Sequence, residues 1–140
     1  MDKILGFDGD YRWLSNFTYL DEPIVMCNLE FKTTENVYQA MKCRNLEDMA
    51  EFVNITPSKA KRLGRTISMV DDWDACKYDV MYHIQMLKYQ QPKFKSLLLQ
   101  TGDLYIEETN TWNDTYWGVC NGIGSNNLGE IIMNIRETLK

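Results

Sequence analysis

The chain has 140 residues, of which 44% are hydrophobic and 25% are charged, and this balance is ordinary for one soluble globular domain. Its formal net charge of −5 argues against a protein that coats nucleic-acid backbone, because such binding needs clustered lysine and arginine. One modified nucleotide could still enter a local pocket.

The cysteines and the single histidine argue against a metal site. No CxxC pair occurs among the cysteines, which are Cys27, Cys43, Cys76 and Cys120, and the one histidine is His83. We therefore expect neither a zinc site nor another metal or cofactor. The chain shows no signal peptide and no apolar run of membrane-spanning length, so we expect reduced thiols, a cytoplasmic location and no membrane partner.

The first third of the chain predicts short strands followed by a helix. Residues 4–7 form one candidate strand, and residues 23–26 and 29–31 could pair as a hairpin. Thr34 is expected to cap a helix that begins near Glu35 and runs to about Phe52.

The middle of the chain predicts two more helices. Thr56 and Pro57 together are a strong helix start signal, and this short helix ends at Gly64. Its basic face is ordinarily solvated but could steer an acidic substrate. Asp72 can cap a longer helix to about Gln90, whose inward stripe consists of Trp73, Val80, Met81, Ile84 and Leu87.

The last third predicts a helix from Pro92, a strand over 104–108 and a final helix near Leu128. Asn127 and Glu130 have the spacing of a capping box for that final helix. The whole chain, 1–140, is therefore expected to be a single α+β domain with several helices packed around a small β-sheet.

Three polar side chains share one face of the first predicted helix. Glu35, Gln39 and Lys42 fall at i, i+4 and i+7, and the stripe continues through the apolar Leu46, Met49, Ala50 and Val53. A first-turn glutamate and a snorkelling lysine would explain them without a site. A polar patch on an inward stripe is costly, however, unless it lines a cleft, where a glutamate can act as acid or base and a desolvated lysine as nucleophile. The pattern leaves both interpretations open.

The segment YRWLSNF, residues 11–17, combines aromatic rings with an amide. Trp13 and Phe17 could stack on a heterocycle, and Asn16 could bond to its edge or to a ribose hydroxyl. Anchoring of an N-terminal loop to the core is the simpler interpretation.

The segment DTYWGVCNGIGSNNLG, residues 114–129, is a glycine-rich loop before a helix. Backbone amides at such a helix start can hold an anion, although glycines there are often only turn residues. Asp114, near Trp117, is a second candidate carboxylate or the acceptor of an Asx-turn.

Seven short stretches over nearly the whole chain resemble the NADAR (YbiA-like) family, in the family's order. They are LSNF (14–17), TENVYQAMK (34–42), PSKAKRLGR (57–65), DDWDACKYDVM (71–81), LLLQTGD (97–103), DTYWG (114–118) and GSNNLGEIIMNIR (124–136). The family includes a riboflavin-pathway N-glycosidase and enzymes that remove ADP-ribose from guanine. The resemblance implies a YbiA-like domain that hydrolyses the C–N bond between a ribose and a nitrogenous base.

The resemblance also implies roles for individual residues. Glu35 becomes a catalytic carboxylate, Lys42 the active-site lysine and Asp114 a further catalytic candidate. The expected substrate-binding residues are Trp13, Asn16, Phe17, Gln39, Trp73, Lys77, Trp117, Gly118 and Asn126. This chain departs from the family where Asn36 replaces a frequent histidine and where Ser125 replaces a frequent lysine, which removes a positive charge from the expected anion site.

The expected substrate is a ribosylated or ADP-ribosylated base, free or within DNA. Glu35 could stabilise the positive charge that develops on the ribose or could activate water. Alternatively, Lys42 could attack the anomeric carbon and form a Schiff base with the opened sugar. A different class of function is a module that binds ADP-ribose or NAD without cutting it. The sequence leaves the oligomeric state open.

Overall fold

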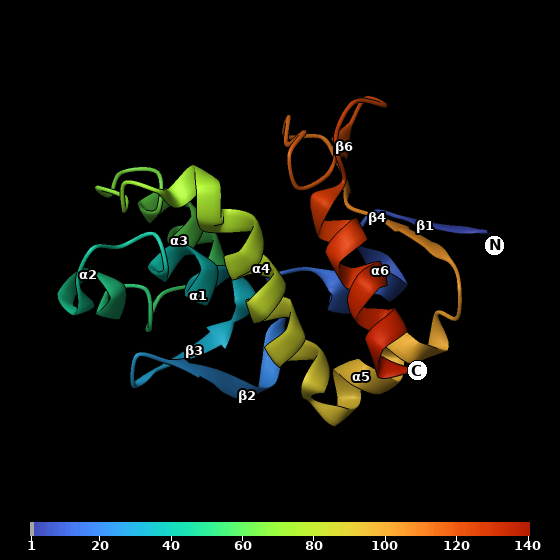
Figure 1. Cartoon of the computed structure of the whole chain (residues 1–140), viewed down its shortest axis with the longest axis horizontal. Helices are drawn as coiled ribbons and strands as arrows, with labels where there is room; N and C mark the ends of the chain where they lie inside the picture. Colours follow the sequence, from blue (N-terminus) through green and yellow to red (C-terminus); the bar gives the residue numbers. More distant parts are fainter. Residues whose placement is uncertain (1) are drawn as a thin grey trace. The chain divides into compact units, whose positions relative to one another are not determined.

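The computed structural model describes residues 2–140, and its helices and short strands give the expected α+β architecture (Figure 1). The chain forms two compact units. The central unit comprises Asn16–Lys88. The terminal unit comprises the chain up to Ser15 together with Tyr89–Lys140.

The central unit begins with an antiparallel hairpin of β2 (Tyr19–Met26) and β3 (Leu29–Thr33). Cys27 and Asn28 join the strands with φ angles of 54° and 64°, the left-handed pair that a tight two-residue hairpin turn requires. The predicted hairpin is confirmed, and β2 begins earlier than expected.

Helix α1 (Thr34–Ala40) follows β3 directly. Its N-cap is Thr33, whose hydroxyl oxygen accepts a hydrogen bond from the Asn36 amide at 3.0 Å. The prediction of Thr34 as the cap was wrong by one residue, because Thr34 instead donates from its hydroxyl to Asn16.

The predicted helix over 35–52 is wrong, because α1 ends at Ala40 and a separate helix, α2 (Leu46–Ala50), begins after a turn. The Asn45 side chain caps α2 by accepting a hydrogen bond from the Asp48 amide, and Cys43 pairs with Met69 in an isolated bridge. Leu46 is 59% exposed, so the inward stripe does not continue past Lys42 as predicted.

Two further helices complete the central unit. Helix α3 (Pro57–Leu63) starts at the predicted Thr56 cap, and α4 (Trp73–Gln90) matches its predicted range, with its last two residues in the terminal unit. Helix α1 packs against α2, α3 and the hairpin. Buried apolar side chains of this unit include Phe31, Val37, Ala40, Phe52 and Ala60.

The terminal unit contains short strands that pair in parallel. Strand β1 (Lys3–Leu5) pairs with β4 (Tyr105–Glu107), and β5 (Thr109–Asn110) pairs with β6 (Val119–Cys120). Within residues 2–140 the expected small sheet is thus divided into two-stranded pieces. Strand β1 is shorter than predicted because Gly6 leaves the extended region with a φ of 96°.

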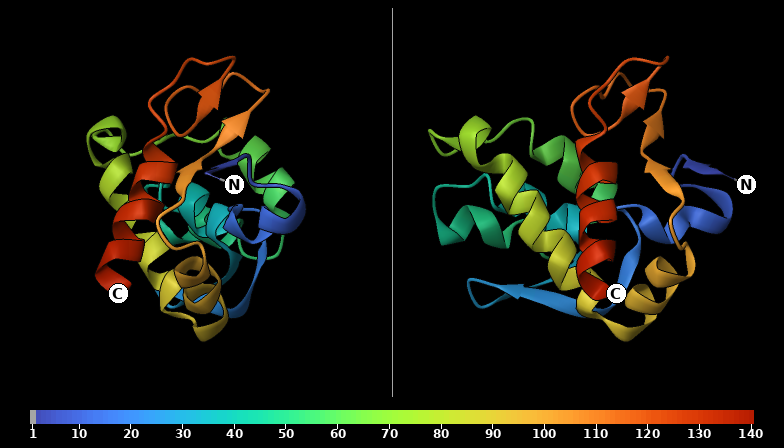
Figure 2. Two further views of the ribbon diagram at one scale, coloured as in Figure 1. Left: turned by 90° about the vertical axis from the view of Figure 1, so that its right-hand side faces the viewer. Right: turned by 45° about the vertical axis from the view of Figure 1, so that its right-hand side comes forward.

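The helices of the terminal unit are the 3₁₀-helix η1 (Gly9–Leu14), α5 (Pro92–Gln100) and α6 (Asn127–Leu139). Helix α6 packs against β4 and α5 (Figure 2). The buried Arg136 on α6 donates from Nη1 to the Thr101 hydroxyl and the Leu104 carbonyl, both at 2.9 Å, which fixes the turn after α5.

The predicted capping box of α6 is wrong. The N-cap is Asn126 rather than Asn127, it has a left-handed φ of 52°, and its side chain makes no capping bond. That side chain instead reaches the strand segment at Ile106 and Glu108, so a contact distant in sequence replaces the local one.

No helix formed by residues 2–140 combines the length and apolar character needed to cross a bilayer.

Candidate functional site

The central unit brings the predicted acid and amide of α1 into direct contact. Glu35 is only 7% exposed, and its carboxylate Oε2 accepts a hydrogen bond of 2.6 Å from Nε2 of Gln39. Both side chains lie on the face predicted from their i,i+4 spacing. Burial and a short hydrogen bond to a charged acceptor are features of a functional carboxylate more than of a solvated helix start.

Asn16 supports the first turn of α1. Its backbone carbonyl accepts from the Glu35 amide at 3.0 Å, and its Oδ1 accepts from the Thr34 hydroxyl at 2.8 Å and from Nε2 of Gln85 at 2.6 Å. These bonds satisfy amide and hydroxyl donors at a helix start that would otherwise need solvent. The observed contacts of Asn16 position Glu35, and its predicted contact with substrate remains a prediction.

Lys42 lies one turn beyond Tyr38, with Nζ 5.6 Å from the centre of the Tyr38 ring. The Tyr38 ring packs on buried Trp73 at a centroid distance of 5.3 Å and an interplanar angle of 56°. The Lys42 carbonyl accepts from the Val70 amide at 2.9 Å, which anchors the turn after α1. The Tyr38 ring thus contacts Trp73 and lies close to the Lys42 amine, and the predicted contact of Trp73 with substrate remains a prediction.

The electrostatic surroundings of Lys42 favour its neutral amine. Burial lowers its pKa from the ordinary value of 10.5, and the positive charges of Lys77 and Arg65 lower it further, while the Glu35 carboxylate acts in the opposite direction. An amine with a lowered pKa is a better nucleophile near neutral pH. The charges of Glu35, Lys77 and Arg65 therefore all act on the Lys42 amine.

Two other predicted residues of the central unit, Lys77 and Phe17, each have a charged neighbour. Lys77 forms an ion pair of 3.3 Å with Asp74, and its side chain is 22% exposed. Phe17 has the Lys61 amine 5.9 Å from its ring centre. A positive charge therefore lies beside Phe17, while that of Lys77 is paired with Asp74.

The terminal unit holds the remaining predicted residues. Asp114 Oδ1 accepts from the amides of Tyr116 at 3.2 Å and Trp117 at 2.9 Å, which is the geometry of the Asx-turn considered above. Trp117 packs edge-to-face on Tyr116 at 4.7 Å, and Trp13 lies 6.5 Å from Tyr11. These contacts shape the loop and leave the catalytic role of Asp114 as a prediction.

Gly118 and Asn126 surround a buried carboxylate that sequence reasoning missed. Glu108 is 9% exposed, and its Oε2 accepts from Nδ2 of Asn110 at 3.0 Å. A Cβ at Gly118 would overlap the Glu108 side chain and carbonyl. Asn126 clamps the same strand, accepting from the Glu108 amide at 3.0 Å and donating to the Ile106 carbonyl at 2.9 Å.

Other contributors were also missed by sequence reasoning, and the signals for them were weak. Tyr38 is on the predicted helix but off its polar stripe, and Arg65 belongs to a basic run that is ordinarily solvated. The sequence predicts Gly64 only as the end of a helix. Among residues 2–140, no group of three or more histidine, cysteine or acidic side chains is arranged to hold a metal ion.

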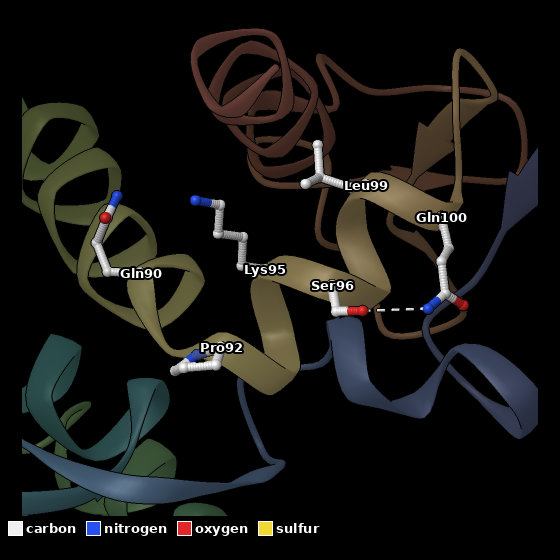
Figure 3. A pocket seen from close by; sticks show the side chains of 6 residues that line it. All are labelled: Gln90, Pro92, Lys95, Ser96, Leu99 and Gln100. Atoms are coloured by element: carbon white, nitrogen blue, oxygen red, sulfur yellow. Dashed lines mark hydrogen bonds between the residues drawn. The ribbon is translucent and has the colours of Figure 1, made fainter.

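An open hollow of about 630 Å³ lies along α5 in the terminal unit (Figure 3). Its lining residues are Gln90, Pro92, Lys95, Ser96, Leu99 and Gln100, and none of them is a predicted site residue. The Gln100 amide donates to the Ser96 hydroxyl at 3.2 Å across its wall. The candidate chemistry is on α1 rather than in this hollow.

A sequence model described as the NADAR domain matches residues 7–140. The chain belongs to the NADAR family. It is 34% identical to the N-glycosidase YbiA of Shigella boydii, over 99% of this chain and 89% of that protein. The NMR structure of Escherichia coli YbiA matches with a TM-score of 0.84 and 32% identity, covering 99% of this chain and 85% of that one.

A further relative, at lower identity, is the chloroplastic riboflavin biosynthesis protein PYRR of Zea mays. It is 30% identical over 76% of this chain, which corresponds to 19% of that protein. With the YbiA matches, these similarities identify an enzyme of the N-glycosidase class with a YbiA-like α+β fold. The expected family, fold class and enzyme class are confirmed.

Proposed function

We propose that this NADAR protein hydrolyses the N-glycosidic bond between a phosphorylated ribose and a nitrogenous base, with Glu35 and Lys42 as the reacting groups. The observation that carries the proposal is the buried Glu35 carboxylate coupled to a lysine whose pKa is lowered by burial. A carboxylate and a free amine are the two groups that such a cleavage can use at neutral pH.

In the first route Lys42 is the nucleophile. Its neutral nitrogen attacks the anomeric carbon, and the C–N bond breaks with its electron pair leaving on the base, which takes up a proton. Ring opening and loss of the remaining N–H proton give a Schiff base, which water then hydrolyses to restore the amine. Glu35 can stabilise the positive charge of the ribose during the first step.

In the second route Glu35 activates water directly. The carboxylate takes a proton from water as oxygen attacks the anomeric carbon, and Lys42 remains a charged group that orients substrate. Both routes require an ionised Glu35. They differ in whether a covalent sugar adduct forms on Lys42.

The charges of the central unit support a substrate that carries phosphate. Lys77 and Arg65 act on Lys42 together with the buried Glu35, and Lys61 lies beside the ring of Phe17. Such a distribution attracts anions. A riboflavin-pathway ribosylaminopyrimidine phosphate meets this requirement, as does ADP-ribosylated guanine. The maize relative is named a riboflavin biosynthesis protein, which favours the former.

Base release followed by mass spectrometry tests the proposal. The protein is incubated with the ribosylaminopyrimidine phosphate and, separately, with an ADP-ribosylated guanine oligonucleotide, with borohydride added to parallel samples. We expect release from a phosphorylated riboside and a reduced sugar adduct on Lys42 if the first route operates. Lys59→Arg, an exposed lysine of α3, is the matched control for Lys42→Arg.

Two results would overturn the proposal or one of its routes. Tight binding of intact substrate in calorimetry, with no base released, would favour the ADP-ribose-binding module instead. Full activity of Lys42→Arg would exclude the Schiff-base route, because arginine keeps the charge but is not a nucleophile.

A further inference from the structure

The side-chain amide of Gln39 lies between the Glu35 carboxylate and Gly64, which has no side chain. Gln39 is 5% exposed, and its Nε2 donates to Glu35 Oε2 at 2.6 Å. An ionised carboxylate only accepts hydrogen bonds, so the amide nitrogen must face Glu35 and the amide oxygen must face away from it. That oxygen, Oε1, is buried against Gly64 and has no hydrogen-bond partner among the described residues.

Gly64 provides the space for this amide. It is the C-cap of α3 with φ −61° and ψ −19°, a right-handed helical conformation that any L-residue adopts. Backbone freedom therefore does not explain glycine here. A Cβ at position 64 would overlap Oε1 and crowd the amide carbon of Gln39, so the missing side chain fits the position of Gln39.

We propose that Gln39, held in place by the bare Cα of Gly64, is a positioning residue that keeps Glu35 ionised and correctly oriented. The inference rests on the proposed function for its catalytic consequence. It changes the role expected for Gln39 from contact with substrate to support of the carboxylate. It also means that the C-terminal end of α3, at Gly64, helps to position the Glu35 carboxylate through Gln39.

The chemistry of the contact explains why a donor is needed. A hydrogen bond donated to a carboxylate stabilises its charged form and lowers its pKa. Both proposed routes need Glu35 as an anion, either to stabilise a developing cation or to take a proton from water. Because packing fixes the Gln39 amide, its hydrogen bond to Oε2 also fixes the orientation of the Glu35 carboxylate.

Other charges act on the same carboxylate. Lys42 follows α1 and is coupled to Glu35, while Arg65 after α3 and Lys77 on α4 are coupled to Lys42. The charged groups of β2, β3 and α2, which pack against α1, are exposed at Asp21, Glu22, Glu30, Lys32 and Glu47. Helix α3 also packs against α1, and of its charged side chains Lys59 and Arg62 are exposed and Lys61 is half-buried. Asp48 on α2 is half-buried and accepts from Asn45. Substitutions at Gln39 and Gly64 leave all of these charges in place, so a change in Glu35 titration reports the amide.

The test measures the Glu35 carboxyl pKa by ¹³C NMR, with the resonance assigned by comparison with Glu35→Gln. We expect Gln39→Met, which keeps the length but removes the donor, to raise that pKa by about one unit. The exposed Gln90→Met is the matched control and should leave it unchanged. In the base-release assay, the acidic limb of the pH–rate profile should move upward by the same amount.

Gly64→Ala gives a second test that leaves α1 unaltered. It should raise the Glu35 pKa by displacing the amide, and it should have no further effect in a Gln39→Ala background, where the overlap is gone. An unchanged Glu35 pKa in folded Gln39→Met, or an equal Gly64→Ala effect with and without Gln39, would overturn the inference. Because the NMR titration needs no turnover, a protein that cleaves no substrate would refute the proposed function and still test Gln39.

Discussion

The Lys42 amine lies 5.6 Å from the centre of the Tyr38 ring, and Tyr38 is packed in turn on Trp73. This places the amine against an aromatic surface rather than in bulk water. Burial then lowers its pKa, which increases the fraction of free amine at neutral pH.

We expect base release to rise with pH as Lys42 loses its proton, if Lys42 is the nucleophile. The midpoint should lie below 10.5, because burial lowers the pKa from that ordinary value. Lys77→Met removes a positive neighbour and should shift the midpoint upward, whereas Lys42→Arg should abolish borohydride trapping and reduce the rate by about 100-fold or more. A pH–rate series on the three proteins checks this. If the rate of base release still rises with pH in Lys42→Arg, the titrating group is not Lys42.

Asn16→Leu should destabilise the protein by about 2 kcal/mol, because the donors of Thr34 and Gln85 would lose their acceptor in a partly buried setting. Urea unfolding measures the change, with the exposed Asn134→Leu as control. Asn16→Asp keeps the Oδ1 acceptor and should lose less. Equal stability of wild type and Asn16→Leu would show that this network contributes nothing.

The strongest local signals of the sequence predicted their elements correctly. Thr56 and Pro57 start α3 as expected, since a hydroxyl cap and a proline at the first helical position act within one turn. The acid–amide pair of α1 also followed from spacing alone. Helix periodicity failed beyond Ala40, because it ignored the competing cap at Asn45.

Other features depend on contacts that no local pattern contains. Asn126 bonds to Ile106 and Glu108, 20 and 18 residues away, instead of capping its own helix. Gly64 has an ordinary helical φ, so only its tertiary contact with Gln39 explains it. Resemblance to the family implies Glu35 and Lys42 as reacting groups, but it could not show that the Tyr38 ring lies near the Lys42 amine and packs on Trp73.

The variant Asp114→Asn distinguishes the role of Asp114 in the turn from the role of its negative charge. Asparagine keeps the Oδ1 acceptor for Tyr116 and Trp117, so the Tm should stay near that of wild type. Asp114→Ala should cost about 1 kcal/mol, because the turn loses that acceptor. If the predicted catalytic role is correct, Asp114→Asn should reduce base release at least about tenfold despite normal stability. Full activity with asparagine would reduce Asp114 to a turn residue.

Burial of Lys88 should make the free energy of unfolding depend on pH. It is fully buried, and burial lowers its pKa to about 7 from 10.5. Between these values the unfolded chain holds a proton that the folded chain lacks, so the free energy of unfolding rises with pH by up to about 1.4 kcal/mol per unit.

Lys88→Met has no such titration, so the stability of wild type relative to this variant should increase from pH 7 to pH 10, by roughly 3–4 kcal/mol at most. Urea unfolding across this range measures the difference, and the exposed Lys95→Met should follow wild type. Parallel stability curves for wild type and Lys88→Met would mean that Lys88 keeps its proton in the folded state. In that case a nearby acceptor, rather than burial, would control its charge.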